Sequence, residues 1–499
     1  MTRKFKNLAK ILAVLTMCFA FLVPVCACEF VDGEPHIYSE WEVVEPNDCG
    51  HDGYRERTCI LCGDEQREII PATGDHNYGL WETAKEADCV SEGQEERTCS
   101  VCGDVDIKTI PSKGGHDFGE NGICSVCGKS DGSNGDLVAG DEQGAKSSDL
   151  SIHFLELGNA SAGDSVLIKC GDTEVLIDAG SQQSSSTTLK NYINKYCTDG
   201  KLEYVIATHA DTDHISGFVG TSSGGNYNGI LYSYEIGTII QFAVTGKNTQ
   251  IYQKFCDAVT YAESRGAQVY TAAQCYDQTD GAQRQYYLDS EQKISINILY
   301  NYYYYNKSSD ENNHSVVTLL TEELESGNRR NYLFTGDLEK DGESKMVDYY
   351  KNVPAGFKTE YNVLPEVDLY KAGHHGSKTS STEKLLEVIK PKHVAVCCCC
   401  GSPEYTKEND NTFPTQIMID NVGKYTDKIY VTTLATNLPA KDENGNYIDQ
   451  KGYGFTSMNG NIVFYSKDGM LNLWCSNNDT ILKDTEWFKE NRVWNGINS

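Results

Sequence analysis

The stretch THADTDH, residues 208–214, places two histidines and two aspartates within seven residues. Packing in a protein core does not require such a density of imidazole and carboxylate groups, which is typical of a metal site. The stretch follows LEYVIA, residues 202–207, an apolar run that predicts a buried strand. A rigid strand end that runs into a loop can aim several ligands at one point. We therefore predict a metal site formed by His209, Asp211, Asp213 and His214.

Three short apolar segments upstream of this stretch predict successive strands. They are SIHFLEL at residues 151–157, SVLIKCG at 165–171 and TEVLIDAG at 173–180. The segment STTLKNYINKYC at 186–197 has apolar residues at helical spacing, so it predicts a helix. The metal motif would therefore follow a strand in an α/β domain.

Two segments downstream also end in groups that can bind a metal ion. RRNYLFTGD, residues 329–337, predicts a strand followed by Asp337, and VDLYKAGHH, residues 367–375, predicts one followed by His374 and His375. Three strand ends would then present imidazole and carboxylate groups toward one edge of a sheet.

Five motifs in order, LIDAG, THADTDHISG, NNHSVVTLL, LFTGD and HHGSKTSS, resemble the metallo-β-lactamase superfamily. Within it, they are most similar to the extracellular hydrolase domain of the ComEC competence proteins. The resemblance implies a four-layer αββα sandwich, an α/β fold, with the metal site at one edge. It also implies two divalent ions, zinc or manganese, that activate a water molecule.

The resemblance assigns roles to individual residues. Asp337 matches a bridging carboxylate, Asp178 a support residue, and either His374 or His375 the late histidine ligand. Asp213 would orient the attacking water and accept its proton. Asp211 stands where other branches have histidine, and this exchange shifts the preference from zinc toward manganese. The alternative for His209 and Asp213 is a hydrogen-bonded strand end without metal.

The motif HHGSKTSS supplies a dense set of hydrogen-bond donors. We predict catalytic roles for His375 and Lys378 and supporting roles for Ser377 and Ser380, because such donors suit phosphate oxygens. This favours a phosphodiester over a β-lactam as substrate. For Lys378 and Ser380 a solvated turn is the alternative.

Two positions depart from the family pattern. Phe413 and Pro414 stand where a histidine-proline pair is expected, and His314 is only a candidate for the histidine of the third motif. If the missing histidine helps to protonate a leaving group, turnover would be slower here or the substrate different.

The N-terminal part carries targeting and repeat signals. Residues 1–27 predict a bacterial export signal, and Cys28 resembles a lipid-attachment cysteine, so we expect a cell-surface lipoprotein, with free secretion as the alternative. A short spacer at 28–35 would precede two and a half copies of a forty-residue repeat at 36–128.

Each full copy of the repeat contains a histidine, a cysteine and an RTCxxCG turn at fixed offsets. The spacing predicts structural zinc, with one site per copy as the simplest count, although a histidine could come from the following copy. Disulfides are the alternative. The repeats resemble zinc-ribbon-like modules of bacterial surface proteins, which suggests a cell-surface partner or a spacer role. The predicted ligands are His36, Cys49, Cys59, Cys62, His76, Cys89, Cys99, Cys102, His116, Cys124 and Cys127.

The remaining boundaries follow from composition. Residues 129–149 are rich in Gly, Ser and Asp and predict a flexible linker, residues 150–480 the hydrolase domain, and 481–499 a C-terminal tail. The formal net charge is −29, which disfavours tight non-specific binding of nucleic acid.

These features together predict an exported phosphodiesterase or nuclease, with nucleic acid as the leading substrate by resemblance. One alternative is a hydrolase of small phosphoesters or lactones. Another is a surface binding protein with a degenerate hydrolase domain.

Four further features have structural interpretations. His153 and His393 flank apolar strands and are expected to be structural histidines. NYYYYN at 301–306 predicts a tyrosine-rich strand and turn, with base stacking as the alternative. VAVCCCCG, ending at Gly401, predicts a buried strand in which cysteine acts as a small apolar residue.

Overall fold

The computed structural model describes residues 36–87, 89, 91–115, 117, 124–125, 137–354, 363–450 and 453–497. The chain divides into two compact units, Met1–Gly115 and His116–Ser499. The predicted export signal and Cys28 lie outside the described residues. None of the helices in these ranges is both long and apolar enough to span a membrane.

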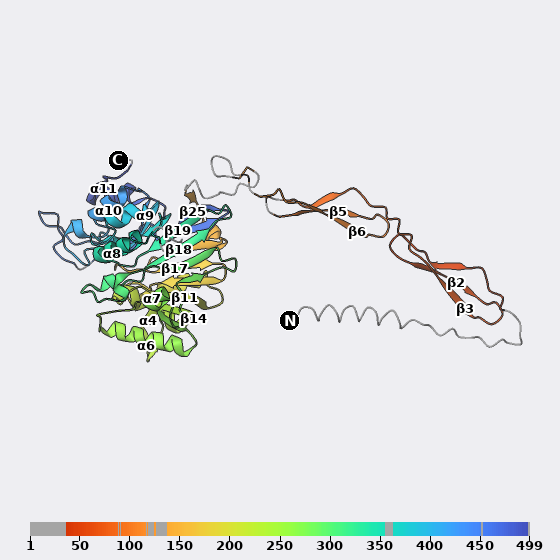
Figure 1. The fold of residues 1–499 in the computed structure, drawn as a ribbon, viewed down its shortest axis with the longest axis horizontal. Helices are drawn as coiled ribbons and strands as arrows, with labels where there is room; N and C mark the ends of the chain where they lie inside the picture. Colours follow the sequence, from red (N-terminus) through yellow and green to blue (C-terminus); the bar gives the residue numbers. More distant parts are fainter. Residues whose placement is uncertain are drawn as a thin grey trace. The chain divides into compact units, whose positions relative to one another are not determined.

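The first unit contains one small antiparallel sheet for each full copy of the repeat (Figure 1). The strands are β1 (Glu42–Glu45), β2 (Gly53–Thr58) and β3 (Glu65–Ile70), then β4 (Glu82–Lys85), β5 (Gly93–Thr98) and β6 (Val105–Ile110). Their side chains are mostly exposed, whereas Cys49, Cys59, Cys89 and Cys99 are buried. In the described part of the repeats, the buried side chains of apolar type are therefore those of cysteines.

The second unit contains two large sheets. The first has nine strands, in the order β15 (Gln268–Thr271), β14 (Glu235–Gln241), β11 (Lys201–Ala207), β10 (Thr173–Ile177), β9 (Val166–Cys170), β8 (Leu150–Phe154), β24 (Ile462–Lys467), β25 (Met470–Cys475) and β7 (Val138–Ala139). Its strands β10, β11, β14 and β15 are parallel to one another. The predicted strands of this region are present with small shifts of their ends.

The second large sheet has eight strands. Their order is β16 (Gln285–Tyr287), β17 (Ile294–Ile298), β18 (Thr318–Glu323), β19 (Arg329–Phe334), β20 (Leu369–Lys371), β21 (His393–Cys400), β22 (Ile429–Thr436) and β23 (Gly454–Ser457). Strands β19 to β22 are parallel. A separate small hairpin pairs β12 (Ser222–Ser223) with β13 (Asn226–Tyr227).

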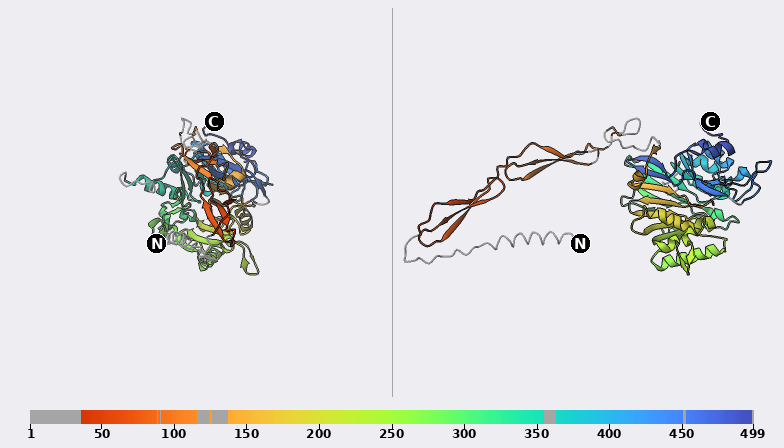
Figure 2. Two further views of the ribbon diagram at one scale, coloured as in Figure 1. Left: turned by 90° about the vertical axis from the view of Figure 1, so that its right-hand side faces the viewer. Right: turned by 180° about the vertical axis from the view of Figure 1, so that it is seen from behind.

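Helices cover the outer face of each sheet (Figures 1 and 2). Buried apolar residues on the nine-stranded side come from α3 (Ser185–Ile193), α4 (Thr212–Val219), α5 (Ile230–Ser233), α6 (Gln250–Ser264) and α7 (Ala272–Asp277). Those on the eight-stranded side come from α8 (Lys340–Lys351), α9 (Glu383–Ile389), α10 (Gln416–Gly423) and α11 (Glu486–Asn491). Between the sheets, Phe154 and Phe334 contact each other with ring centroids 6.2 Å apart. The predicted four-layer αββα sandwich is confirmed.

Part of the predicted linker is structured. Residues 137–149 contain β7, which pairs with β25, and α2 (Glu142–Lys146). A Cβ atom on either Gly140 or Gly144 would lie 2.4 Å from the hydroxyl oxygen of Tyr465. These glycines therefore permit close packing and do not signal flexibility, which corrects the interpretation of the composition.

The predicted C-terminal tail also belongs to the folded unit. Leu482, Trp487 and Phe488 are buried in the core on the side of the eight-stranded sheet. The guanidinium of Arg492 donates hydrogen bonds to the carbonyl oxygens of Thr412 and Pro414. The large aromatic and aliphatic residues of this segment were the available signal that it packs against the domain.

The tyrosine run does not form the predicted strand. Tyr302–Tyr304 form the 3₁₀-helix η1, which begins where the Asn301 side chain accepts a hydrogen bond from the backbone N–H of Tyr303. Tyr303 and Tyr304 are buried, so the run serves mainly packing. An asparagine cap outweighed the β-propensity of the tyrosines.

The other three structural interpretations agree with the contacts. His153 is fully buried between Ser151 Oγ and Tyr192 Oη, at 2.8 and 2.9 Å. His393 is buried, and its Nδ1 lies 2.9 Å from the carbonyl oxygen of Asp368. All four cysteines of the run lie buried in β21.

Candidate metal centre

The carboxyl ends of four strands bring the predicted ligands together. β10 ends before Asp178 and β11 before His209, while β19 ends before Asp337 and β20 before His374 and His375. Because β10 and β11 are parallel, as are β19 and β20, each pair of ends meets at the same edge of its sheet. The candidate centre lies where these carboxyl ends of the two sheets face each other.

His209 is a neutral imidazole with a free ring nitrogen. The hydroxyl of Thr208 donates to Asp178, so its oxygen accepts a hydrogen bond from His209 Nδ1 at 3.1 Å. Burial lowers the pKa of His209 to about 3. Its buried Nε2 has no hydrogen-bond partner within the described structure. A buried ring nitrogen without a partner suits a metal ligand.

His214 is held by Asp178, the predicted support residue. His214 Nδ1 lies 2.7 Å from Asp178 Oδ2, and its Nε2 lies 3.2 Å from Asp337 Oδ2. Burial alone would lower the pKa of His214, but Asp337 and Asp178 outweigh it and raise the pKa well above the usual value.

His375 faces the same carboxylate from the other sheet. Its Nδ1 donates to the carbonyl oxygen of Cys397 at 2.9 Å, within the cysteine run of β21. Its Nε2 lies 3.1 Å from Asp337 Oδ2 and 3.2 Å from Asp213 Oδ2. His375 and His374 both have positive φ, 54° and 44°, in the sharp turn η4 (Gly373–Gly376) that presents them.

His374 lies farther from the carboxylates than His375. Its Nδ1 is 2.7 Å from Glu339 Oε1, and its Nε2 is 4.0 Å from Asp337 Oδ2. Glu339 also accepts a hydrogen bond from Thr379 Oγ1 at 2.8 Å. Sequence reasoning missed Glu339, although an acidic residue shortly after Asp337 was the available signal.

The four histidines share one arrangement. In each of them, Nδ1 contacts a hydrogen-bond partner, and Nε2 lies within 4.0 Å of a carboxylate oxygen of Asp337 or Asp211. The four are His209, His214, His374 and His375. A partner at Nδ1 fixes the tautomer and the ring orientation of a metal-binding histidine.

Two of these histidines and two aspartates form a compact cluster. One ligand atom from each of Asp213, His214, Asp337 and His375 lies within 4.8 Å of every other. Burial would raise the pKa of Asp213 and Asp337, but the histidines outweigh it, so both carboxylates are ionised. The carboxylates in turn raise the pKa of His375. The site therefore stabilises positive charge, and its donor set fits a divalent cation.

A second group of ligand atoms lies beside this cluster. His209 Nε2 and Asp211 Oδ2 are 3.7 Å apart, and the charge of Asp337 is near enough to act against the lowering of the pKa of His209. Asp211, a predicted ligand, also forms an ion pair through Oδ1 with Lys247, which sequence reasoning missed. Two neighbouring groups of ligand atoms are compatible with two ions.

The centre also contains a buried lysine that the sequence did not reveal. Lys371, only 2% exposed, forms an ion pair with Asp164, and its Nζ lies 3.4 Å from Asp337 Oδ1. Asp164 Oδ1 is in turn 3.2 Å from His375 Nδ1. The lysine interrupts the apolar segment VDLYKA, which was the available signal.

The predicted phosphate-binding donors are engaged elsewhere. Lys378 donates to Asn411 Oδ1 at 2.8 Å and lines a different pocket with Arg492. Ser380 donates to the carbonyl oxygen of Leu338 at 2.8 Å. Ser377 Oγ is 2.8 Å from Thr379 Oγ1. These contacts do not test phosphate binding, which stays a prediction, but the burial of Ser380 does not agree with a solvated turn at that residue.

Two aromatic residues border the cluster. Phe413, at the position of the expected histidine, contacts His374 and His375 with ring centroids 5.8 and 6.1 Å apart. The hydroxyl of Tyr405 donates to Asp213 Oδ2 at 3.3 Å. Phe413 offers no proton, whereas Tyr405 supplies an O–H group beside the predicted base.

His314 does not reach the cluster. Its Nε2 accepts a hydrogen bond from the backbone N–H of Ser308 at 3.2 Å, and its Nδ1 lies 3.5 Å from Glu311 Oε2. The third-motif candidate is therefore a buried structural histidine near the start of β18.

The predicted zinc ligands of the repeats form two groups among the described residues. One contains His36, Cys59 and Cys62, and the other contains Cys49, His76, Cys99 and Cys102. His116 and Cys127 lie outside the described residues, whereas Cys89 and Cys124 are described and buried. Cys49 thus lies with the ligands of the following copy.

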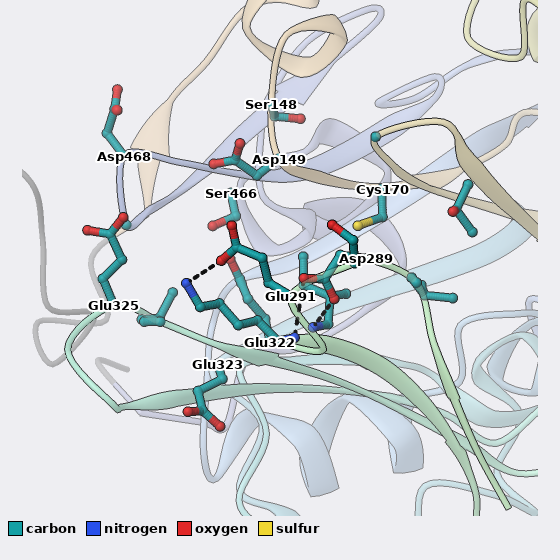
Figure 3. Close-up of a pocket in the computed structure, with 18 of the residues that line it drawn as sticks. Ser148, Asp149, Cys170, Asp289, Glu291, Glu322, Glu323, Glu325, Ser466 and Asp468 are labelled. Carbon is teal, nitrogen blue, oxygen red and sulfur yellow. Dashed lines mark hydrogen bonds and ion pairs between the residues drawn. The ribbon is translucent and has the colours of Figure 1, made fainter. Parts of the chain in front are cut away.

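A separate acidic pocket of about 600 Å³ is lined by residues of both large sheets (Figure 3). It includes Asp172 and Thr173, at the start of β10, whereas the metal centre follows the end of that strand. Asp289, Glu322 and Asp468 also line it, and none of the predicted ligands does. The pocket is therefore distinct from the centre.

Comparison with known proteins agrees with this geometry. Residues 158–248, which include the motif at His209–His214, match the family model of the metallo-beta-lactamase superfamily. The chain is also 35% identical over 69 residues to ComE operon protein 3 of Bacillus subtilis (strain 168). That match covers 14% of this chain and 7% of the relative, so the chain spans a small part of the relative's length.

Solved metallo-beta-lactamases are similar at low sequence identity. One from Thermotoga maritima is 11% identical, with a TM-score of 0.23, and the match covers 37% of this chain and 77% of that one. The Rm3 metallo-beta-lactamase is 10% identical, with a TM-score of 0.25, covering 46% and 81%. The family resemblance predicted from the sequence motifs is confirmed by the family model and the partial relative.

Proposed function

Residues 158–248 belong to the metallo-β-lactamase superfamily, and from this premise we propose that the domain is a metal-dependent hydrolase of phosphodiesters. The observation that carries the proposal is the cluster of Asp213, His214, Asp337 and His375, with Asp337 between imidazoles from both sheets. Divalent ions bound there would supply Lewis acidity and lower the pKa of a water molecule.

The protein's own groups would position that water and move its proton. Asp213 is ionised, and its Oδ2 lies 3.2 Å from His375 Nε2, so this oxygen can accept a proton beside the reacting centre. Tyr405 donates to the same oxygen and would exchange this contact for one with a substrate oxygen. Phe413 would exclude water from the face of His375.

The choice of a phosphodiester rests on the donor set. Carboxylates from both sheets and the Asp211 substitution favour hard, oxygen-preferring ions, which serve in many two-metal phosphoesterases. The serines and the lysine of HHGSKTSS give no support, because their contacts lie within the turn and with Asn411.

The charge around the centre favours a small phosphodiester or phosphoester as the second candidate beside nucleic acid. Lys247 is paired with Asp211, and Glu404 lies close enough for Asp213 to add to burial in raising its pKa. A nucleic acid strand requires several cationic side chains that contact phosphates. With a net charge of −29, the chain as a whole repels a polyanion.

A substrate panel tests the proposal. Metal-depleted protein would be supplied with Mn²⁺ or Zn²⁺ and assayed on single- and double-stranded DNA, RNA, a chromogenic phosphodiester, a lactone and a chromogenic β-lactam. We expect hydrolysis of the chromogenic phosphodiester, with kcat reduced about 10²- to 10⁴-fold in Asp213→Ala.

The same panel separates the alternatives. Asp172→Ala, an exposed residue in the turn before β10, is the matched control and should retain full activity. Activity that persists in Asp213→Ala, or that needs no metal, would contradict the mechanism. Lactone hydrolysis alone would replace the substrate class, and inactivity on every substrate would leave the surface-binding alternative.

Location and partners form part of the same proposal. We propose export, with lipid attachment at Cys28 as the route to the membrane surface, because the N-terminal sequence pattern predicts both. The repeats would then contact another component of the cell surface or separate the hydrolase from its anchor.

A further inference from the structure

One cysteine of the first repeat copy lies among the ligands of the second copy. Cys49 Sγ is 3.4 Å from Cys99 Sγ, although 50 residues separate them in the sequence. His76 Nδ1 is 3.2 Å from Cys102 Sγ. One ligand atom from each of these four residues lies within 4.8 Å of every other, three thiols and one imidazole in all.

Backbone contacts explain why Cys49 reaches the following copy. The N–H of Gly74 donates to the carbonyl oxygen of Cys49 at 3.2 Å, just before the chain reaches His76. Gly50, directly after Cys49, packs against the second copy, since a Cβ there would lie 3.1 Å from Cys102 Sγ. The segment around Cys49 therefore docks where the second copy begins.

The other predicted ligands of the first copy lie together within that copy. His36, Cys59 and Cys62 form a separate group of three, with Cys62 Sγ 3.3 Å from His36 Nδ1. The first copy thus divides its ligands, with the histidine and the Cys-x-x-Cys pair in one set and Cys49 in the set of the second copy.

We propose that adjacent repeats share a zinc ion, which Cys49 of the first copy binds together with His76, Cys99 and Cys102 of the second. A Cys₃His set is typical of a closed structural zinc site, in which a tetrahedron places sulfurs about 3.8 Å apart. A disulfide between Cys49 and Cys99 would instead consume two of the four donors and leave only the pair of His76 and Cys102.

The truncated third copy is consistent with this division. It retains a histidine and a Cys-x-x-Cys pair but has no counterpart of Cys49. In the first copy, that cysteine lies with the ligands of the following copy, and the third copy is not followed by another copy of the repeat. Cys89, the counterpart in the second copy, is 1% exposed, and its carbonyl oxygen accepts from the N–H of Gly115 at 2.7 Å.

The shared ion would stabilise the repeats in place of an apolar core. Among the described residues of the two full copies, the buried side chains of apolar type are all cysteines. Modules of this size need a metal ion or a disulfide to remain folded. An ion that takes ligands from both copies would also fix one copy against the next.

A double-mutant cycle on the full chain tests the pairing. Cys49→Ser would be introduced into two backgrounds, one lacking Cys59 and Cys62 and the other lacking Cys99 and Cys102, each with serine replacements. Bound Co²⁺ would be measured by thiolate-to-cobalt absorption and zinc by elemental analysis. The cluster around Asp337 contains no thiol, and Cys197, which lies with Glu174 and Asp199 in the hydrolase unit, is unchanged in every variant, so differences in absorption between variants report the repeats.

The two pairings predict opposite results. Shared sites predict that Cys49→Ser removes one ion from the protein lacking Cys59 and Cys62, and none from the protein lacking Cys99 and Cys102. Sites within each copy predict the reverse, which would overturn the proposal. An unchanged metal content in both backgrounds would overturn it too, as would cysteines that resist alkylation until a reductant is added.

Discussion

Replacing Asp337 with asparagine is expected to lower kcat/KM for phosphodiester hydrolysis by about 10³-fold or more. The residues of the cluster act as a unit, so the loss of one of them removes most of the activity that depends on all of them. Asp337 Oδ2 lies 3.2 Å from His214 Nε2 and 3.1 Å from His375 Nε2, so its negative charge connects the two sheets at the centre. Asparagine keeps the shape of the side chain but removes the charge that would hold a cation. The measurement is steady-state hydrolysis of the chromogenic phosphodiester at saturating metal.

The matched control is Asp172→Asn, the same substitution in the exposed turn before β10. This variant should retain the activity of the original protein. An Asp337→Asn variant within about tenfold of that control would show that the carboxylate is dispensable and that the hydrolytic site lies elsewhere.

Replacing Lys371 with methionine is expected to destabilise the metal-depleted hydrolase domain by about 3–5 kcal/mol, the usual cost of breaking a buried ion pair. The lysine is 2% exposed and lies between Asp164 and Asp337. Both carboxylates are also buried, so water solvates them poorly. Burial alone would lower the pKa of Lys371, but the two carboxylates raise it, so the ammonium is charged. A urea titration followed by circular dichroism would report the loss.

Two further variants define this effect. Lys351→Met, at the exposed end of α8, should change stability by no more than about 0.5 kcal/mol. Adding Asp164→Asn to Lys371→Met should recover part of the loss, because one uncompensated charge is removed. If Lys371→Met unfolds at the same urea concentration as Lys351→Met, the buried charges are not coupled as the contacts indicate.

The sandwich was predicted through the family resemblance of five motifs, and several of these motifs lie where predicted strands end. An apolar segment followed directly by His209, Asp337 or His375 is recognisable without a structure, since period and composition are local properties. The choice between His374 and His375 required the structure. The two histidines are adjacent in one turn, and both have positive φ. His375, which contacts β21, has its Nε2 3.1 Å from Asp337 Oδ2, whereas the Nε2 of His374 is 4.0 Å away.

Residues that act through distant contacts were not predictable. Lys371 and Asp164 pair across the sandwich, and no local pattern joins positions so far apart. The motif that contains Lys378 is rich in donors and predicts phosphate binding, whereas in the structure Asn411 accepts the hydrogen bond of this lysine. Donor composition does not determine the direction of a side chain.

Glycine and repeat spacing were also ambiguous. Gly140 and Gly144 indicated a linker, yet both lie against the ring of Tyr465 in the packed domain. The forty-residue period predicted the ligands of the repeats but not their pairing, because each offset recurs in the next copy. Only the distances among Cys49, Cys99 and Cys102 separate the two arrangements.

The metal content of Asp337→Asn tests the central claim most directly. The full chains of this variant and of Asp172→Asn would be purified in parallel, and the manganese and zinc bound per chain would be measured by mass spectrometry. Both chains retain the repeats, so the difference reports only the hydrolase centre. We predict fewer ions per chain in Asp337→Asn than in Asp172→Asn. Equal metal content in the two variants would contradict a metal centre built on Asp337.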